Sequence, residues 1–232
     1  MKRILFIIMI FWNLFSGHCA EPVDWANKAR YFQSNQELAQ LDDTSRVVLM
    51  GNSITEFWEE THPEFFTGNH LVCRGIGGQV SSQMLARFRQ DVINLKPRAV
   101  VINCGTNDIA ENNGTYDEDI TMDNIMSMTE LAQAHGIIVV LSSVLPTDSF
   151  IWNTGVKDVG GKIDRLNRRI IGYCTSQHIP YIDYHTPMRG SGAAMKSAFT
   201  DDGVHPNADG YLVMEAKLLE MLKNLQLYHP IK

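Results

Sequence analysis

Three residues of this 232-residue chain have the types and spacing for nucleophilic catalysis, namely Ser53, Asp202 and His205. Asp202 lies three residues before His205 in the run Asp-Asp-Gly-Val-His, a better offset than that of Asp201. One tight turn can bring the Asp202 carboxylate to Nδ1 of the imidazole and leave Nε2 free to face a hydroxyl. An imidazole held in this way can remove the proton of a serine while its oxygen attacks a carbonyl carbon. The expected chemistry is acyl transfer.

Ser53 lies at the expected junction between a strand and a helix, a position that suits a nucleophile. It lies in Gly51-Asn52-Ser53-Ile54-Thr55, directly after an apolar run, where a strand is expected to turn into a helix. A serine at this point exposes its hydroxyl, and its backbone N–H lies at the positive end of the helix, where it can bind an oxyanion. The alternative is an ordinary helix N-cap, which serine also favours.

Two further polar clusters follow other apolar runs. Arg74-Gly75-Ile76-Gly77-Gly78-Gln79 has neither the Walker lysine nor the full dinucleotide spacing, so it does not indicate a nucleotide site. Its glycines would let the backbone approach a reacting carbonyl closely. In Gly105-Thr106-Asn107-Asp108, the Asn107 amide is a neutral donor for an oxyanion. The alternative for both clusters is a turn stabilised by local hydrogen bonds.

The elements that must position these residues alternate along the chain. Five short apolar runs predict strands at Val47–Met50, Leu71–Cys73, Ala99–Cys104, Ile137–Leu141 and Ile179–Ile182. Longer stretches with helical spacing lie between and after them. This alternation predicts a parallel sheet between two layers of helices, because parallel strands need crossover connections and bury both faces of the sheet. We expect residues 142–162 to form an irregular excursion at the edge where such sheets bind ligands. Within it, Phe150, Ile151 and Trp152 either form an aromatic wall for a sugar or short acyl chain or anchor the loop to the core.

In order and spacing, the four clusters resemble the blocks of the GDSL/SGNH hydrolase family. The resemblance runs from Gly51-Asn52-Ser53 to His205-Pro206, with Asn52-Ser53-Ile54 in place of the family's Asp-Ser-Leu. It implies an α/β fold, a three-layer α/β/α flavodoxin-like sandwich with a five-stranded parallel sheet, as one domain over residues 21–232. A glycine two residues after Ser53 is absent, which argues against the nucleophile elbow of the α/β-hydrolases. The implied site has no cofactor or metal, and its residues are the triad Ser53, Asp202 and His205 and the oxyanion donors Ser53, Gly78 and Asn107.

The resemblance does not determine which ester is the substrate. We expect O-acetyl esters of carbohydrates, with lipase, lysophospholipase, thioesterase and arylesterase activities as alternatives. Two other classes compete with a serine esterase. A metal-dependent phosphoesterase would need more carboxylate or histidine ligands at the strand ends and gives Ser53 no role. A non-catalytic sugar-binding module could use the same fold without the reaction.

The N-terminus has the pattern of an export signal. Lys2 and Arg3 precede an apolar run that is too short to span a bilayer and ends in small and polar residues. We therefore expect residues 1–20 to be a signal peptide and the protein to be periplasmic or extracellular. Cys19 is an alternative lipidation site that would attach the protein to a membrane. The formal net charge of −6 does not favour nucleic acid as a partner, and nothing in the sequence indicates an oligomeric state.

Overall fold

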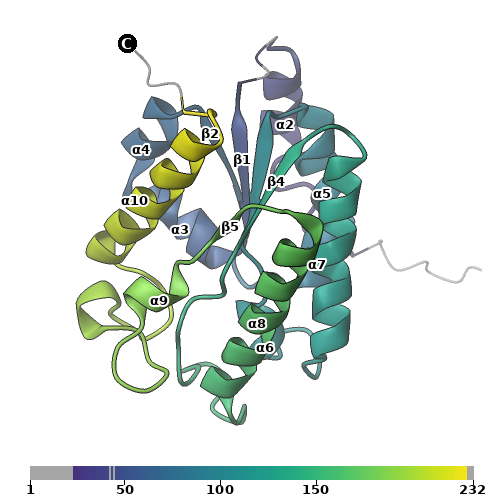
Figure 1. Cartoon of the computed structure of the whole chain (residues 1–232). Helices are drawn as coiled ribbons and strands as arrows, with labels where there is room; N and C mark the ends of the chain where they lie inside the picture. The colour runs from purple at the N-terminus through teal and green to yellow at the C-terminus, as the bar shows by residue number, and fades with distance from the viewer. Residues whose placement is uncertain (1–22, 42, 44, 229–232) are drawn as a thin grey trace, which may run out of the picture.

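The computed structural model describes residues 23–41, 43 and 45–228, so the predicted signal peptide and Cys19 lie outside the described residues. Five parallel strands form one sheet in the order β2-β1-β3-β4-β5 (Figure 1). This is the strand order of the flavodoxin-like fold, and it confirms the fold class predicted from the sequence. The strands are β1 (Val47–Gly51), β2 (Leu71–Gly75), β3 (Ala99–Ile102), β4 (Ile138–Ser142) and β5 (Tyr181–Ile182).

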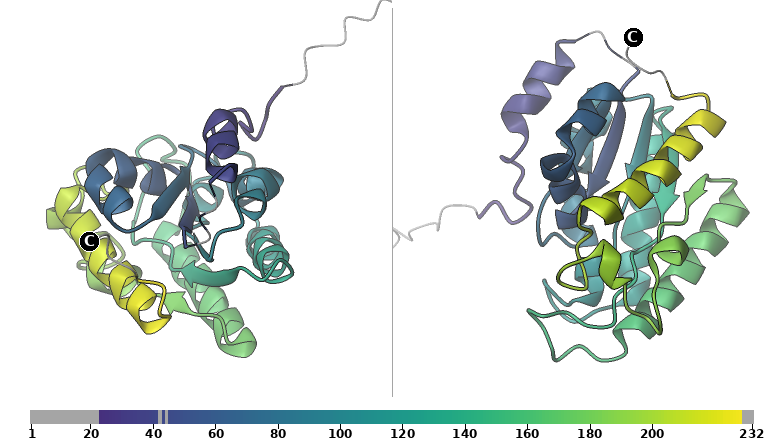
Figure 2. Two further views of the ribbon diagram at one scale, coloured as in Figure 1. Left: turned by 90° about the horizontal axis from the view of Figure 1, so that it is seen from above. Right: turned by 90° about the vertical axis from the view of Figure 1, so that its left-hand side faces the viewer.

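Helices cover both faces of the sheet, as the view from above in Figure 2 shows. Alternate strand residues point into two separate cores, with Val48 and Met50 in one and Val47 and Leu49 in the other. Burial on both faces explains why the strands are continuous apolar runs rather than alternating ones. The first core contains α5 (Ser81–Asp91), α7 (Glu118–Gln133) and α8 (Val159–Gln177), and the second contains α3 (Ser53–Thr61), α4 (Pro63–Gly68) and α10 (Ala208–Asn224).

The register of the strands aligns their carboxyl ends. Gly51 pairs with Gly75, and Ser142 pairs with Ile182, so the segments that follow these residues leave the sheet at one edge. This edge lies toward α6 (Thr106–Ile109) at the bottom of Figure 1. The polar clusters found in the sequence follow these strands and are therefore gathered there.

The segment 24–31 packs along α5 and against the loop before it. Three of its backbone carbonyls accept hydrogen bonds from glutamine side chains, at distances of 2.7, 2.7 and 2.6 Å. The pairs are Gln79 with Ala26, Gln83 with Trp25 and Gln90 with Lys28. This N-terminal segment continues into α2 (Phe32–Ala39). The other short elements are η2 (Ile93–Leu95), α9 (His185–Met188) and η3 (Ser197–Phe199).

Each predicted strand differs from the observed one by one or two residues at one or both ends, and the predicted strand Ala99–Cys104 ends at Ile102. Two of the differences from the prediction have a local physical cause. β5 contains only Tyr181 and Ile182, because Pro180 has no N–H to donate to the ladder, although its carbonyl accepts from the Leu141 N–H. The irregular excursion ends at residue 158, and Gly160 and Gly161 lie in the first turn of α8. A Cβ at Gly160 would lie 2.2 Å from the Ala193 Cβ, so this glycine permits close packing of the helix start and does not mark a loop.

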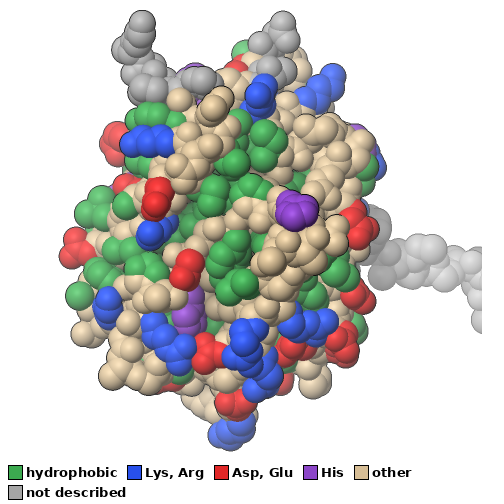
Figure 3. All heavy atoms as spheres, viewed as in Figure 1, with side chains coloured by type: hydrophobic (Ala, Val, Ile, Leu, Met, Phe, Trp, Pro, Cys, Tyr) green, Lys and Arg blue, Asp and Glu red, His purple; other side chains and the backbone are tan. Residues whose placement is uncertain are grey.

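The surface carries charges of both signs. Lys, Arg, Asp and Glu side chains are interspersed on the face seen in Figure 3, and hydrophobic side chains gather on it between α10 and β5. No helix within residues 23–228, as far as they are described, has the length and apolar character needed to cross a bilayer.

Candidate active site

Ser53 is the first residue of α3, at the turn that follows β1. The Asn52 side chain caps this helix by accepting a hydrogen bond from the Ile54 N–H at 3.1 Å. The Ser53 N–H makes no hydrogen bond within the described residues, as expected for a donor in the first turn of a helix. The end of β2 passes very close to this turn, since a Cβ at Gly75 would lie 2.7 Å from the Asn52 carbonyl oxygen. Glycine is required there because any side chain would push the two segments apart.

The three residues predicted to form a triad lie in one chain of hydrogen bonds. Ser53 Oγ is 2.9 Å from His205 Nε2, and His205 Nδ1 is 2.6 Å from Asp202 Oδ2. The other carboxylate oxygen, Asp202 Oδ1, accepts from the backbone N–H groups of Val204 and His205, each at 2.8 Å. The turn from Asp202 to His205 thus holds both the carboxylate and the imidazole in place just before α10. The arrangement leaves Nε2 able to accept the serine proton.

The environment of Asp202 keeps its carboxylate ionised. Burial by itself raises the pKa of this group, but hydrogen bonds from the His205 ring and from the backbone N–H groups of His205 and Val204 outweigh burial and lower the pKa below its ordinary value of 3.8. An ionised carboxylate at Nδ1 fixes the tautomer of His205 and stabilises the imidazolium that forms when Nε2 takes a proton.

The loop after β2 brings a backbone donor beside Ser53. Gly78 has φ +75°, in the left-handed region that favours glycine, and its N–H makes no hydrogen bond within the described part of the chain. The preceding N–H, of Gly77, is occupied by Glu56 Oε2 at 2.7 Å. A Cβ at Gly77 would lie 3.9 Å from the Ser53 Cβ, so the loop passes directly next to the serine.

Asn107 in α6 adds a side-chain donor to this place. Its Nδ2 donates to the Gln79 carbonyl at 3.0 Å, which uses one of the two amide hydrogens. Its Oδ1 accepts from Asn112 Nδ2 at 3.0 Å, and the same Asn112 nitrogen lies 3.2 Å from the Gly78 carbonyl oxygen. Gly78 and Asn107 are therefore within reach of one amide group. Together with the Ser53 N–H, the Gly78 N–H and Asn107 Nδ2 are the groups predicted as donors to an oxyanion.

The structure separates the residues of the predicted aromatic wall. Trp152 is 44% exposed, and its ring centroid is 6.1 Å from that of His205. Phe150 is 1% exposed in the core and packs against the Trp152 ring at 5.2 Å. Phe150 therefore anchors the loop to the core, as the alternative prediction had it, and its ring packs against that of Trp152. Ile151 is exposed.

Phe57 and Glu56, which were not predicted, also contribute to the site. The Phe57 ring lies 5.2 Å from the His205 ring on the face of α3 that also carries Ser53, four residues earlier. Glu56 receives the Gly77 N–H and an ion pair from Arg30, at 2.9 Å, which joins the N-terminal segment to the loop. Glu56 and Phe57 lie three and four residues after Ser53, so helical spacing alone places them on the same face of α3 as the serine.

Arg87 of α5, which was also not predicted, ties the strand ends together from inside the protein. Its side chain is fully buried and forms an ion pair with Asp91 at 2.8 Å. Its remaining nitrogens donate to Gln79 Oε1 at 2.6 Å and to the carbonyls of Gly51 and Arg74 at 3.0 and 2.9 Å. One guanidinium thus joins the ends of β1 and β2 to Gln79, whose carbonyl accepts from the Asn107 side chain.

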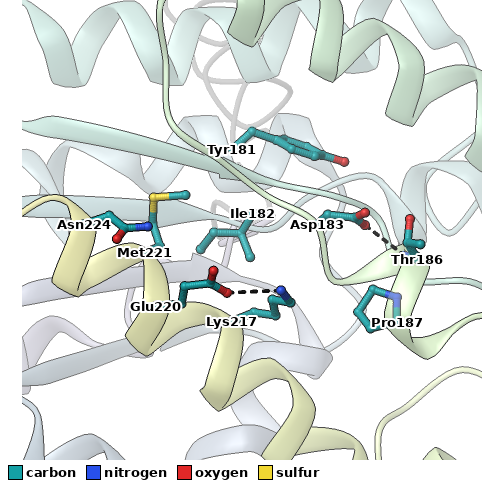
Figure 4. A pocket seen from close by; sticks show the side chains of 9 residues that line it. All are labelled: Tyr181, Ile182, Asp183, Thr186, Pro187, Lys217, Glu220, Met221 and Asn224. Atoms are coloured by element: carbon teal, nitrogen blue, oxygen red, sulfur yellow. Dashed lines mark hydrogen bonds and ion pairs between the residues drawn. The ribbon is translucent and has the colours of Figure 1, made fainter.

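Another hollow lies away from these residues. It has a volume of about 450 Å³ and lies between β5, α9 and α10, with Tyr181, Asp183 and Met221 in its lining (Figure 4). Its Lys217 and Glu220 side chains pair with each other at 3.1 Å. None of the triad or oxyanion residues lines it. Within the described ranges, no three His, Cys, Asp or Glu side chains are grouped as metal ligands would be.

Known proteins share both the sequence pattern and the fold. The model of the GDSL-like lipase/acylhydrolase family matches residues 49–213. A protein of Bacteroides fragilis assigned as an acylhydrolase is 52% identical, with a TM-score of 0.86, and the match covers 89% of this chain and all of that one. A GDSL-like lipase of Bacteroides thetaiotaomicron is 50% identical, with a TM-score of 0.84, over 86% of this chain and 98% of that one.

Among curated proteins, the N-acylneuraminate cytidylyltransferase of Escherichia coli is 24% identical over 82% of this chain. That match spans 43% of the length of the cytidylyltransferase. A second match, to an uncharacterised lipoprotein of Bacillus subtilis, covers 31% of this chain and 31% of the lipoprotein. The chain therefore spans less than half the length of the curated relatives it matches.

Proposed function

The chain belongs to the GDSL-like lipase/acylhydrolase family, and we propose that it hydrolyses carboxylic esters at Ser53 through an acyl-enzyme. The observation that carries this proposal is the continuous hydrogen-bond chain from Ser53 Oγ through His205 to Asp202. Beside it lie the N–H groups of Ser53 and Gly78, which have no partner among the described residues. A serine, a base oriented by a carboxylate and unoccupied oxyanion donors are the parts that acyl transfer needs.

The reaction follows from these contacts. As Ser53 Oγ bonds to the ester carbon, its proton moves to His205 Nε2, and the carbonyl oxygen becomes an oxyanion held by the N–H groups of Ser53 and Gly78 and by Asn107 Nδ2. Collapse of this intermediate breaks the ester bond, and the alcohol leaves with the proton from Nε2. Water then attacks the acyl-serine and gives a proton to Nε2. When this second tetrahedral intermediate collapses, the acid is released and Nε2 returns the proton to Ser53 Oγ.

For the substrate, we propose O-acetyl esters of carbohydrates. The support is the half-exposed indole of Trp152 beside His205, which offers an apolar face with a polar edge to a sugar ring. The glycines at 77 and 78 add no side chain between this face and Ser53. An acetylxylan esterase of Geobacillus stearothermophilus has a similar fold, with a TM-score of 0.62 at 16% identity, a likeness of fold alone.

Replacing Asn107 with alanine is expected to lower kcat by about 10²–10³. The variant removes one oxyanion donor but leaves the chain from Ser53 to Asp202 in place. Steady-state kinetics on a soluble acetyl ester, together with a circular dichroism spectrum to verify the fold, would check this. An unchanged kcat would contradict the assignment of Asn107 to the oxyanion hole.

Comparison of substrates tests the proposed specificity. We expect kcat/KM to be highest for acetylated oligosaccharides, lower for acetyl and butyryl aryl esters, and lowest for long-chain aryl esters and lysophospholipids. Replacing the exposed Trp152 with alanine should lower kcat/KM for the oligosaccharide more than for the small acetyl ester. A preference for long acyl chains would favour the lipase or lysophospholipase alternative. Full turnover in the presence of a chelator would exclude a metal-dependent phosphoesterase.

A further inference from the structure

Asn112, in the turn after α6, makes side-chain contacts in two directions. Its Oδ1 accepts from the indole N–H of Trp152 at 2.9 Å, and its Nδ2 is 3.0 Å from Asn107 Oδ1 and 3.2 Å from the Gly78 carbonyl oxygen. Its backbone N–H also donates to the Asn107 carbonyl at 3.1 Å. One amide side chain thus lies between the exposed Trp152 ring and two residues of the oxyanion hole.

The direction of each hydrogen bond in this network is fixed, because some of its groups can only donate and others can only accept. An indole N–H can only donate, so the oxygen of the Asn112 amide must face Trp152. The Gly78 carbonyl can only accept, so the nitrogen of that amide must face Gly78 and Asn107 Oδ1. The Gln79 carbonyl can also only accept, so the nitrogen of the Asn107 amide must face it. One hydrogen of Asn107 Nδ2 binds Gln79, and the second is left for the oxyanion.

We propose that Asn112 is a positioning residue that couples Trp152 to the oxyanion hole by orienting the Asn107 amide and holding the Gly78 peptide. The proposal rests on the proposed function, because it assigns Asn112 a role through Asn107 and Gly78. A hydrogen bond accepted at Oδ1 polarises the Asn107 amide and makes its N–H groups stronger donors. Gly78 is held on its other side by Glu56, which binds the Gly77 N–H, so Asn112 completes the restraint on this loop.

A consequence of this coupling is that Trp152 affects turnover as well as binding. Asn112 is exposed to solvent, and the Trp152 ring beside it is half-exposed, so a substrate that covers the indole also covers the hydrogen bond to Asn112. Water then competes less for the Asn112 amide, and its contacts to Asn107 and Gly78 strengthen. The leaving group that contacts Trp152 therefore helps to order the donors of the oxyanion.

The test measures kcat and KM on 4-nitrophenyl acetate for the variants Asn112→Ala, Asn112→Asp and Trp152→Phe and for the double variant Asn112→Ala/Trp152→Phe. Asn112→Ala is expected to lower kcat by about 10- to 30-fold, and Trp152→Phe, which keeps a ring but loses the N–H, by about 3- to 10-fold, with KM little changed. Asn112→Asp keeps the acceptor for Trp152 but loses the donor, so it should be at least as impaired as Asn112→Ala. Combining Trp152→Phe with Asn112→Ala should cause no further loss, because both changes act through one chain.

Asn113 offers a matched control. It too accepts an indole N–H, from Trp25 at 3.5 Å, but among the described residues its side chain makes no hydrogen bond with Asn107 or Gly78. Asn113→Ala is expected to leave kcat unchanged, and thermal unfolding of each variant separates a loss of fold from a loss of positioning.

Two results would overturn the proposal. A kcat within twofold of the parent for Asn112→Ala, beside a strongly impaired Asn107→Ala, removes the role of Asn112 and leaves the proposed function intact. Multiplicative losses in the double variant would show that Trp152 and Asn112 act independently of each other. A full kcat for Asn107→Ala or Ser53→Ala instead contradicts the proposed function itself and, with it, the role of Asn112.

Discussion

Replacing Ser53 with alanine is expected to lower kcat by about 10⁶ while the protein remains folded. The hydroxyl oxygen is the only heavy atom removed, and its one side-chain hydrogen bond among the described residues is to His205 Nε2. Without it, no acyl-enzyme can form, and the oxyanion donors have no tetrahedral intermediate derived from the serine to stabilise. Single-turnover kinetics with a chromogenic acetyl ester, which should show a burst for the parent and none for the variant, would measure this loss.

An exposed serine provides the control for this variant. Ser176, near the end of α8, donates to the Tyr173 carbonyl at 2.9 Å and accepts from Gln177 Nε2 at 3.5 Å, both in its own helix. Ser176→Ala should therefore keep full activity. An organophosphonate should label the parent and Ser176→Ala once per chain and should not label Ser53→Ala. Labelling of Ser53→Ala to the same extent would place the nucleophile elsewhere.

Arg87→Met is expected to reduce the free energy of unfolding by about 3–5 kcal/mol. The change leaves the fully buried Asp91 carboxylate without its ion-pair partner and removes the donors to the Gly51 and Arg74 carbonyls. Among the described residues, Asp91 would keep only the side-chain hydrogen bond from Asn35 at 2.6 Å, too little to compensate a buried charge. Urea unfolding followed by tryptophan fluorescence, with all variants at one pH, would measure the difference.

The same helix supplies a control for Arg87. Arg89 is exposed on α5, and Arg89→Met should change the unfolding free energy by less than about 0.5 kcal/mol. Removing the charge of Asp91 together with Arg87, in Arg87→Met/Asp91→Leu, should restore part of the lost stability, because no unpaired buried charge remains. A loss below about 1 kcal/mol for Arg87→Met would show that the ion pair contributes little to the stability of the strand ends.

Features with local causes could be predicted from the sequence. The five strands are apolar runs because both faces of the sheet are buried, and the contact between Asp202 and His205 needs only one turn of chain. Ser53 and Asn107 follow strands whose order brings them to one edge, so a correct fold class places them together. For these residues, the local sequence and the rules for parallel sheets are sufficient.

The supporting residues could not be predicted, because their partners are far away in the sequence. Asn112 meets Trp152 40 residues later, and Arg87 reaches the Gly51 carbonyl 36 residues earlier. In the sequence, these are an asparagine in a polar loop and an arginine in a helix, which normally face solvent. Phe150 and Trp152 show the same limit, since two aromatic residues of one short loop have opposite exposure.

The segment before α2 matters for anyone who prepares a shorter version of this protein. A chain that begins at Phe32 would lack the carbonyl that holds the Gln79 side chain and the Arg30 partner of Glu56. Glu56 binds the Gly77 N–H in the loop after β2, and the Gln79 carbonyl holds the Asn107 side chain, so the shortened protein could fold and still be a poor catalyst. Residual activity in a truncated preparation would then report on the ordering of this loop, not on the integrity of the triad.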